Sequence, residues 1–595
     1  MTVILVLSAG AMDTARRIAA IVPGARIHGW APRVSGTDAG FSDVGAELRL
    51  LFGAGIPIVG VCAAGLLIRL LAPVLTDKST EPPVLAVAED GSAVVPLLGG
   101  HHGANILARE IGTGLGAAVA ITTASDVRYG IALDEPPPGW SLAAGGDVKA
   151  FAAALLSGQG VAVTGTAPWL DALPRTDTSR LRIQITDAMT TPEPGLLVYH
   201  PHRLAIGVGC ERGADPDAVI SLVQATLAEA GLAGAAVAGV YSLDLKADEV
   251  AIHAVATMLQ RPARFFAAAT LEAETPRLSA PSAAVFQAVG CHGVAEAAAL
   301  AAAGPDGILV VTKRKSARAT CAVARATAPF AGSDRGQAQG RLAIVGIGPG
   351  CRDWRTPEAE RLIAAATDLV GYHLYLDLLG PLTTGKQHHG SELGDETARA
   401  TLALELAAAG RSVVLVSSGD AGIYAMATLV FELLDRAPRP GWRRIAVQVS
   451  PGISALQAAA ARAGAPLGHD FCAISLSDLL TPWPVIETRI LAAAAADFVI
   501  AFYNPASLRR RTQLERACAI LRAHRPADTP VILARNLGRD DEQVTTTTLG
   551  ALDPAVVDML TLVVVGATTS RRVGPWTYTP RGYAAKDSFP QGETP

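Results

Sequence analysis

Short apolar runs that end in small-residue turns constrain the fold of this 595-residue chain more than any other feature. The clearest is residues 411–417, a β-branched run followed by Ser418, Gly419 and Asp420, with a helical pattern beginning near Ala425. A strand that is buried on both faces is apolar along its whole length. Where such a strand is followed by a tight turn and a helix, a crevice forms at the carboxyl end of the parallel sheet. We therefore predict an α/β fold with a ligand site built largely from main-chain groups.

A second turn of this kind follows the apolar residues 342–345. It contains three glycines and a proline: Gly346, Gly348, Pro349 and Gly350. It is not a dinucleotide-binding fingerprint, because the proline interrupts the glycine pattern and the next helix is expected only after Thr356. By itself the pattern fits a tight turn without a ligand as well as a binding loop.

Composition excludes several classes of protein. No run offers the roughly 20 strongly apolar residues of a membrane span, and the first residues lack a signal-peptide pattern. A net charge of −4 gives no reason to expect a nucleic-acid partner. The seven cysteines include no CxxC pair, so we predict neither a disulfide framework nor a metal site, and we expect a cytoplasmic protein.

The length predicts several domains, and shifts in composition separate them. We expect α/β domains at residues 1–128 and 195–326 and a third α/β region at residues 341–583. Between them lie a middle or linker domain of low definition at residues 129–194 and a linker at residues 327–340, and residues 584–595 are expected to form a frayed tail. The basic residues 313–315 follow a late strand and are expected to form a solvated loop that could receive carboxylates.

The third region carries four motifs in a fixed order, at residues 418–424, 449–457, 474–478 and 502–509. The first contains Ser-Gly-Asp-Ala-Gly-Ile-Tyr and the last contains Tyr-Asn-Pro-x-Ser. This set resembles the tetrapyrrole (precorrin) methylases and, within them, the precorrin-3B C17-methyltransferases, which also contract the macrocycle. The resemblance implies a two-lobed class III methyltransferase of cobalamin biosynthesis.

The same resemblance implies S-adenosyl-L-methionine as cofactor, a precorrin or cobalt-precorrin as substrate, and a homodimer formed through this half. The residues implied to hold the cofactor are Ser418, Gly419, Asp420, Ile423, Tyr424, Ala425, Met426, Ser454, Ala455, Tyr503, Asn504, Ala534, Ala567 and Thr568. The Gly346, Gly348, Pro349 and Gly350 loop is implied to line the trough for the macrocycle. Asp420 fits a second role equally well, as a cap of the following helix.

Ring contraction requires a group that moves a proton near the migrating carbon. By residue type the candidates are Tyr372, Tyr375, His388 and His389, of which we take Tyr372 and His388 as the catalytic candidates. The sequence does not choose among them, because each also fits a structural role.

The first half resembles a second family. Its motifs are residues 61–65, 99–101, 209–213, 281–282 and 288–296, together with Asn105, and they are similar to those of the cobalt-precorrin-5A hydrolases. The resemblance implies opening of a lactone on the macrocycle, with loss of a two-carbon fragment as acetaldehyde.

That reaction requires an activated water, donors for an oxyanion and cations for the acidic substrate. We assign His101 as general base or orienting group, and main-chain groups near residues 99–103 or at 209–213, which begin with Gly209, as oxyanion donors. Arg212, Lys313 and Lys315 are assigned as ligands of the acid arms. The alternatives are that His101 and His102 are solvated turn residues, and that this half is a non-catalytic tetrapyrrole carrier. Whether the substrate contains cobalt or is metal-free also stays open.

Overall fold

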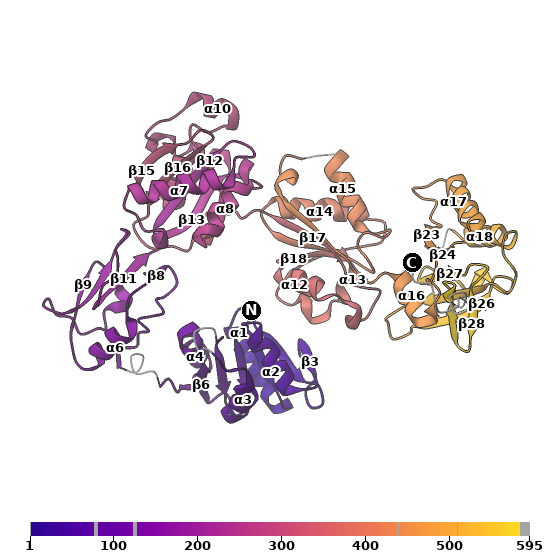
Figure 1. The fold of residues 1–595 in the computed structure, drawn as a ribbon, viewed down its shortest axis with the longest axis horizontal. Coiled ribbons are helices and arrows are strands. Elements are labelled where there is room, and N and C mark those ends of the chain that lie inside the picture. The colour runs from indigo at the N-terminus through magenta and orange to yellow at the C-terminus, as the bar shows by residue number, and fades with distance from the viewer. Residues whose placement is uncertain (1, 77–80, 123–127, 437–438, 508–509, 584–595) are drawn as a thin grey trace, which may run out of the picture. The chain divides into compact units, whose positions relative to one another are not determined.

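The structure, a computed structural model, describes residues 2–76, 81–122, 128–436, 439–507 and 510–583 (Figure 1). It divides into two compact units, Met1–Gln339 and Gly340–Pro595. Each unit contains sheets flanked by helices, so the predicted multidomain α/β architecture is confirmed. In the described part of the chain, no helix combines the length and the apolarity that crossing a membrane requires.

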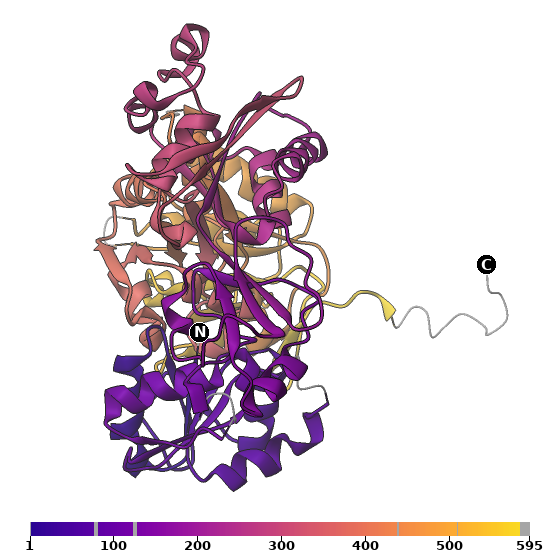
Figure 2. The ribbon, with the colours of Figure 1, turned by 90° about the vertical axis from the view of Figure 1, so that its left-hand side faces the viewer.

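The first module is a seven-stranded sheet of order β3-β2-β1-β4-β5-β6-β7 (Figure 2, indigo). Alternate residues of β1 point to opposite faces: Ile4 and Val6 join the core beneath α1 and α4, and Val3 and Leu5 join the core beneath α2 and α3. Strands β5 and β6 pair antiparallel as a hairpin. The elements are β1 Val3–Val6, α1 Met12–Ile21, β2 Arg26–Trp30, β3 Ala39–Phe41, α2 Val44–Gly53, β4 Ile58–Val61, α3 Ala64–Leu71, β5 Val84–Val87, β6 Ala93–Leu98, α4 Ala104–Leu115 and β7 Ala118–Val119.

The middle module is more ordered than the sequence pattern indicated. It is a four-stranded sheet of order β8-β11-β10-β9 with its own core around Phe151, Leu155, Ile183 and Tyr199, and its strand β11 lies beyond residue 194. Short strands separated by Gly, Pro and Asp turns carry little periodic signal, which is why the sequence indicated a linker. The elements are β8 Trp140–Leu142, α6 Val148–Leu156, β9 Val161–Thr164, β10 Leu181–Ile185 and β11 Leu196–Pro201.

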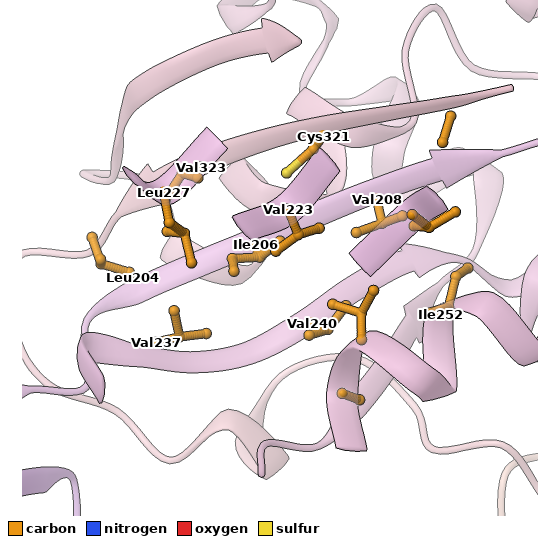
Figure 3. Close-up of a cluster of buried hydrophobic side chains, with 14 of the residues drawn as sticks. Leu204, Ile206, Val208, Val223, Leu227, Val237, Val240, Ile252, Cys321 and Val323 are labelled. Atoms are coloured by element: carbon orange, nitrogen blue, oxygen red, sulfur yellow. The ribbon is translucent and has the colours of Figure 1, made fainter. Parts of the chain in front are cut away.

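The third module is a five-stranded sheet of order β14-β13-β12-β16-β15. Figure 3 shows part of its core, in which Ile206 and Val208 of β12 and Val240 of the neighbouring strand β13 lie in one cluster with Val223 of α7. Residues 313–315, expected in a loop, lie in strand β15 instead. The elements are β12 Leu204–Cys210, α7 Pro216–Glu229, β13 Val237–Leu243, α8 Val250–Leu259, β14 Ala263–Phe266, α9 Ala268–Glu272, α10 Ala283–Val289, α11 Ala295–Ala303, β15 Ile308–Lys315 and β16 Ala319–Arg325.

The second unit begins with a parallel sheet of order β19-β18-β20-β17-β21. Its two faces are covered separately, by α14 and α15 on one side and by α12 and α13 on the other (Figure 1). The elements are β17 Arg341–Gly346, α12 Pro357–Ala365, β18 Asp368–Tyr372, α13 His373–Asp377, β19 Gln387–Ser391, α14 Glu396–Ala408, β20 Ser412–Ser417, α15 Met426–Arg436 and β21 Ala446–Ser450.

A second lobe follows in the same unit, with a mixed sheet of order β23-β24-β27-β25-β26 and a small sheet of order β22-β29-β28. Strand β27 runs antiparallel to β24 and β25, and helix α16 packs on this sheet through Leu456 and Ala459. The elements are α16 Ala455–Ala463, β22 Gly464–Ala465, β23 Phe471–Ser475, α17 Trp483–Ala495, β24 Val499–Tyr503, α18 Gln513–Arg522, β25 Pro530–Arg535, β26 Gln543–Thr548, β27 Thr561–Val565, β28 Arg571–Val573 and β29 Trp576–Tyr578.

A buried carboxylate joins three strands at the amino end of the first-lobe sheet. Asp368 starts β18 and accepts hydrogen bonds from Thr367, from His389 at 2.9 Å and from Arg411 at 2.6 Å. Burial raises the pKa of Asp368, but these hydrogen bonds outweigh burial and hold its pKa below the ordinary value of 3.8. The carboxylate is therefore charged in the native state and ties β19 and the turn before β20 to β18.

We predict that Asp368→Asn lowers the free energy of unfolding by about 1.5–3 kcal/mol at neutral pH, because hydrogen bonds to a charged group are lost. A depressed acid pKa stabilises the fold fully above pH 3.8 and less as the pH falls through the lower native pKa. Denaturant unfolding should thus show a difference between wild type and variant that is constant near neutrality and shrinks below pH 3.8. A difference that grows on acidification would contradict this assignment.

Candidate functional site

The carboxyl ends of the parallel strands in the second unit meet at one edge. The register pairs Gly346 at the end of β17 with Ser417 at the end of β20, and Val345 with Ser450 at the end of β21. Tyr372 ends β18 one residue beyond the pairing of Gly371 with Val416. The predicted turns at residues 346–350 and 418–424 therefore follow neighbouring strands at the same carboxyl edge of the sheet. In open α/β sheets, ligands bind at this edge.

Main-chain atoms of three turns touch at this edge. A Cβ on Gly346 would lie 2.6 Å from the Gly419 carbonyl oxygen, and a Cβ on Gly452 would lie 2.2 Å from the same oxygen. Gly348 and Gly419 exchange N–H···O bonds of 3.2 and 2.8 Å, and both have positive φ, at 77° and 64°. Side chains other than hydrogen would push these turns apart, so the glycines are required for their close approach.

Asp420 fastens two of these turns together. Its Oδ1 accepts a 2.8 Å hydrogen bond from the Gly422 N–H, and its Oδ2 accepts a 3.1 Å bond from the Gly452 N–H. Helix α15 begins only at Met426, so the expected role of Asp420 as a cap of that helix differs from what the structure shows. The carboxylate instead fixes the shape of the 418–424 turn against the turn after β21.

One polar side chain at the same edge lacks a hydrogen-bond partner. The Ser417 hydroxyl is buried and bonds to no atom in the described part of the chain. The turn after it is accessible, because residues 418–420 are partly exposed and residues 422–424 are exposed. A Cβ on Gly419 would be in ordinary contact with the main chain of Ala455 and Ser454, at 3.8 and 3.9 Å. Ser454 caps α16 through a capping box with Gln457. An orphaned hydroxyl beside an accessible glycine turn fits a polar ligand such as the predicted adenosyl cofactor.

Two tyrosines connect this edge to the second lobe. The Tyr424 hydroxyl donates to the Ala473 carbonyl at 2.9 Å, and the Tyr503 hydroxyl accepts from the Leu456 N–H at 3.2 Å. Their ring centroids lie 5.3 Å apart, and burial raises the pKa of both phenols, which are therefore neutral. Asn504, next to Tyr503, donates to Ser475 at 3.1 Å. The structure thus brings the predicted residues 418–424, 454–455 and 503–504 together.

Other predicted cofactor residues are placed differently. The side chains of Met426 and Ala534 are buried in cores, so only their main chains can reach a ligand. Ala567 and Thr568 follow β27, which runs antiparallel to β24, so they lie beyond the opposite end of that sheet. There the Thr568 N–H and hydroxyl bond to Asp497, which precedes β24. Strand direction, which the sequence motif does not reveal, separates this pair from Tyr503.

The two catalytic candidates are also separated. Tyr372 lies at the carboxyl edge, with its ring 5.2 Å from that of Tyr375 in a T-shaped contact. His388 pairs with Leu369 near the start of β18, and its Nε2 lies 2.9 Å from the Thr383 carbonyl oxygen. His388 therefore lies toward the amino end of the sheet, away from the site. Sequence reasoning missed Ser417 and Gly452, although the turn at residues 450–452 was a signal for the second.

In the first unit, the predicted substrate residues share the carboxyl edge of the third module. Gly209 lies near the end of β12, Arg212 follows it, and Lys313 lies near the end of β15, which runs in the same direction. Arg212 is already paired with Asp248 at 2.6 Å, whereas the Lys313 ammonium donates to the Ala280 carbonyl at 2.9 Å. The side chain of His101 lies outside the described part of the structure, so its predicted role is not tested.

Comparison with known proteins gives three family matches. A model of Tetrapyrrole (Corrin/Porphyrin) Methylases matches residues 341–553. Models described as Cobalamin synthesis G N-terminal and Cobalamin synthesis G C-terminus match residues 47–126 and 204–324.

Three relatives match the second unit. "Probable cobalt-factor III C(17)-methyltransferase" of Salmonella typhimurium is 48% identical over 242 residues, 41% of this chain and 99% of that protein. "Precorrin-3B C(17)-methyltransferase" of Sinorhizobium sp is 46% identical over 250 residues, 41% of this chain and 98% of that protein. "Cobalamin biosynthesis protein CobIJ" of Mycobacterium bovis is 45% identical over 264 residues, 42% of this chain and 50% of that protein, so the chain spans half the length of that relative.

We predict that Gly452→Ala weakens binding of S-adenosylhomocysteine at least about tenfold, or ~1.4 kcal/mol, because the new methyl group displaces the Gly419 turn. Isothermal titration measures the effect. Gly53→Ala is the matched control, since no heavy atom lies within 4 Å of a Cβ at that position in α2. Wild-type affinity in a folded Gly452→Ala protein would show that the glycine contact does not shape the site.

Proposed function

We propose a function from one premise: the chain belongs to the tetrapyrrole methylase family, and it joins cobalamin synthesis G modules to the methylase in one polypeptide. We propose that the second unit methylates carbon 17 of a precorrin-3-type macrocycle and contracts the ring. The first unit would open the lactone of cobalt-precorrin-5A and release acetaldehyde. The observation that carries the methylase assignment is 48% identity over 99% of a C17-methyltransferase.

The glycine edge would hold S-adenosylmethionine, which supplies an electrophilic methyl group on a sulfonium. The main chain of residues 418–424 and the groups at Ser454 and Asn504 offer donors and acceptors for its polar parts. Ser417, with its orphaned hydroxyl, would gain a partner there. No side chain has to change charge for methyl transfer, so this site contributes mainly alignment of the reacting atoms.

Tyr372 is the candidate that we propose for proton transfer during ring contraction. It lies at the carboxyl edge, where the macrocycle would approach the glycine loop after β17, and it is partly exposed. His388 lies too near the start of β19 to reach that edge without a change in strand register. A phenol at the reacting centre can hold or release a proton at its hydroxyl.

For the first unit, we propose binding of the acid arms by Lys313 and attack of water on the lactone carbonyl, with His101 as the base. The cobalt-containing substrate is favoured by the presence of the cobalamin synthesis G modules beside the methylase. The second candidate is a metal-free substrate, because the Sinorhizobium relative is named for precorrin-3B.

We predict that wild-type protein with S-adenosylmethionine adds one methyl mass to cobalt-factor III or to precorrin-3B. Tyr372→Phe should slow formation of the contracted ring by about 10²-fold, because a proton-transfer group is lost. His388→Ala should stay within about twofold of wild type. Single-turnover kinetics followed by mass and absorbance test both variants, and the reverse pattern would assign proton transfer to the histidine.

We predict acetaldehyde release when the full chain is incubated with cobalt-precorrin-5A, and loss of that release in His101→Ala. Coupled alcohol dehydrogenase detects the product. Tight binding of the substrate with no acetaldehyde from wild-type protein would instead support the non-catalytic carrier.

A further inference from the structure

A histidine in the third module is held by a carboxylate that the proposed reactions do not use. The Nδ1 of His292 lies 2.9 and 3.0 Å from the two carboxylate oxygens of Glu272, which ends α9. Glu272 also accepts from the His292 N–H at 2.9 Å and from the Thr275 hydroxyl at 3.0 Å.

These contacts fix the tautomer and the orientation of the imidazole. Both Glu272 oxygens face Nδ1, and the same carboxylate accepts from two other donors, so Nδ1 is the donor in this contact. In the neutral imidazole, Nε2 then keeps its lone pair. The Phe286 ring stacks on the imidazole, with centroids 4.5 Å apart and planes 25° from parallel. The His292 side chain is 30% exposed, and no atom in the described ranges hydrogen-bonds to Nε2. The ring is thus rigidly held, with one nitrogen lone pair left uncommitted.

The pair lies at the edge that carries the predicted substrate residues. Glu272 follows β14, and Val294, two residues after His292, is the side chain that a Cβ on Gly209 would meet at 3.3 Å. The Ser282 N–H donates to the His292 carbonyl at 2.8 Å, and Lys313 donates to the Ala280 carbonyl at 2.9 Å. One short loop, residues 280–282, therefore contacts both the main chain of His292 and the Lys313 ammonium group.

A buried acid makes that loop rigid. Glu296 accepts hydrogen bonds from the Ser279 N–H at 2.8 Å and hydroxyl, and from the Lys313 N–H at 2.8 Å. It is almost completely buried in α11. The loop and strand β15 are thus fixed to the same helix, so the distance between the imidazole and the Lys313 cation is set by the fold.

An imidazole whose second N–H is held by a carboxylate is the usual arrangement of a metal-ligating histidine. The described part of the chain contains no group of three or more His, Cys, Asp or Glu residues placed to hold a free metal ion. A metal in a tetrapyrrole needs no such group, because the macrocycle already supplies four nitrogen donors. One axial protein donor is then sufficient.

We propose that His292 binds the cobalt of a tetrapyrrole as an axial ligand through Nε2, while Glu272 orients the ring and Lys313 pairs with a peripheral carboxylate. Nε2 donates its lone pair to the cobalt and a bound water leaves, and Nδ1 keeps its proton throughout. The inference rests on the proposed function only in taking a cobalt-containing macrocycle as the ligand of this unit.

A second pair in the first module provides a matched comparison. The Nδ1 of His28 lies 2.6 Å from Glu47, but the His28 side chain is only 12% exposed. Since axial coordination requires an accessible Nε2, His28→Gln should leave coordination unchanged.

The test uses the full chain with cob(II)yrinic acid, a cobalt corrinoid with free carboxylates and no attached base. We expect electron paramagnetic resonance of the wild-type complex to show each cobalt line split into a triplet by one nitrogen. Labelling the protein with ¹⁵N-histidine should turn the triplets into doublets. His292→Gln should abolish the splitting and His28→Gln should retain it.

Affinity gives a second readout. Glu272→Gln should weaken cobyrinic acid binding about tenfold or more, because the partner of the ligating histidine is altered. Lys313→Ala should weaken binding of cobyrinic acid but not of cobinamide, whose peripheral groups are amides. Circular dichroism confirms that each variant is folded.

Absence of nitrogen splitting in the wild type, its persistence in His292→Gln or its loss in His28→Gln would overturn the proposal. If His292→Gln loses acetaldehyde release although the wild type shows no nitrogen splitting, His292 acts in proton transfer and the proposal is also overturned. Nitrogen splitting without acetaldehyde release or methyl transfer would support the ligand assignment and count against the proposed function, so the two failures are distinguishable.

Discussion

The contact of three glycine main chains at the carboxyl edge of the first-lobe sheet is the constraint on which the second unit depends. Gly346 and Gly452 leave room for the Gly419 carbonyl oxygen, and only hydrogen fits at either position. Because the turns close on one another, Asp420 can bond to both of them. The Ser417 hydroxyl at the same edge is buried and has no partner among the residues that the structure describes. The same closeness forms a narrow edge lined by main-chain groups, which suits a cofactor that reacts through alignment rather than through a change of protein charge.

The third module uses the same edge of an α/β sheet in a different way. The turn after β12 carries Arg212, and the turn between α10 and α11 carries His292. A buried glutamate holds the loop before α10 to strand β15. A large flat acidic ring can be recognised by either kind of edge. In the proposed function, one unit offers main-chain groups to a cofactor, and the other offers cations and an imidazole to a macrocycle and its metal.

Sequence patterns predicted the strands and turns of the cofactor edge better than they predicted which residues meet there in the fold. The apolar run before Ser418 and the glycines after residue 345 predicted parallel strands, because such runs are buried on both faces. Strand direction and register are tertiary properties. The sequence therefore could not show that Ala567 and Thr568 lie at the opposite end of their sheet from Tyr503. For the same reason it could not show that His388 and His389 lie toward the amino end of the first-lobe sheet. Glu272 and His292 are 20 residues apart and meet only because α10 folds back, which no local pattern indicates.

The central claim is that glycine-lined main chain at residues 418–424 forms the cofactor site of the second unit. A crystal structure of the full chain with S-adenosylhomocysteine tests it most directly. The account predicts one molecule per chain, hydrogen-bonded to main-chain groups of that turn and facing Ser454 and Asn504. Density for the compound at another edge of the unit, or a turn closed over by neighbouring side chains with no compound bound at saturating concentration, would contradict it.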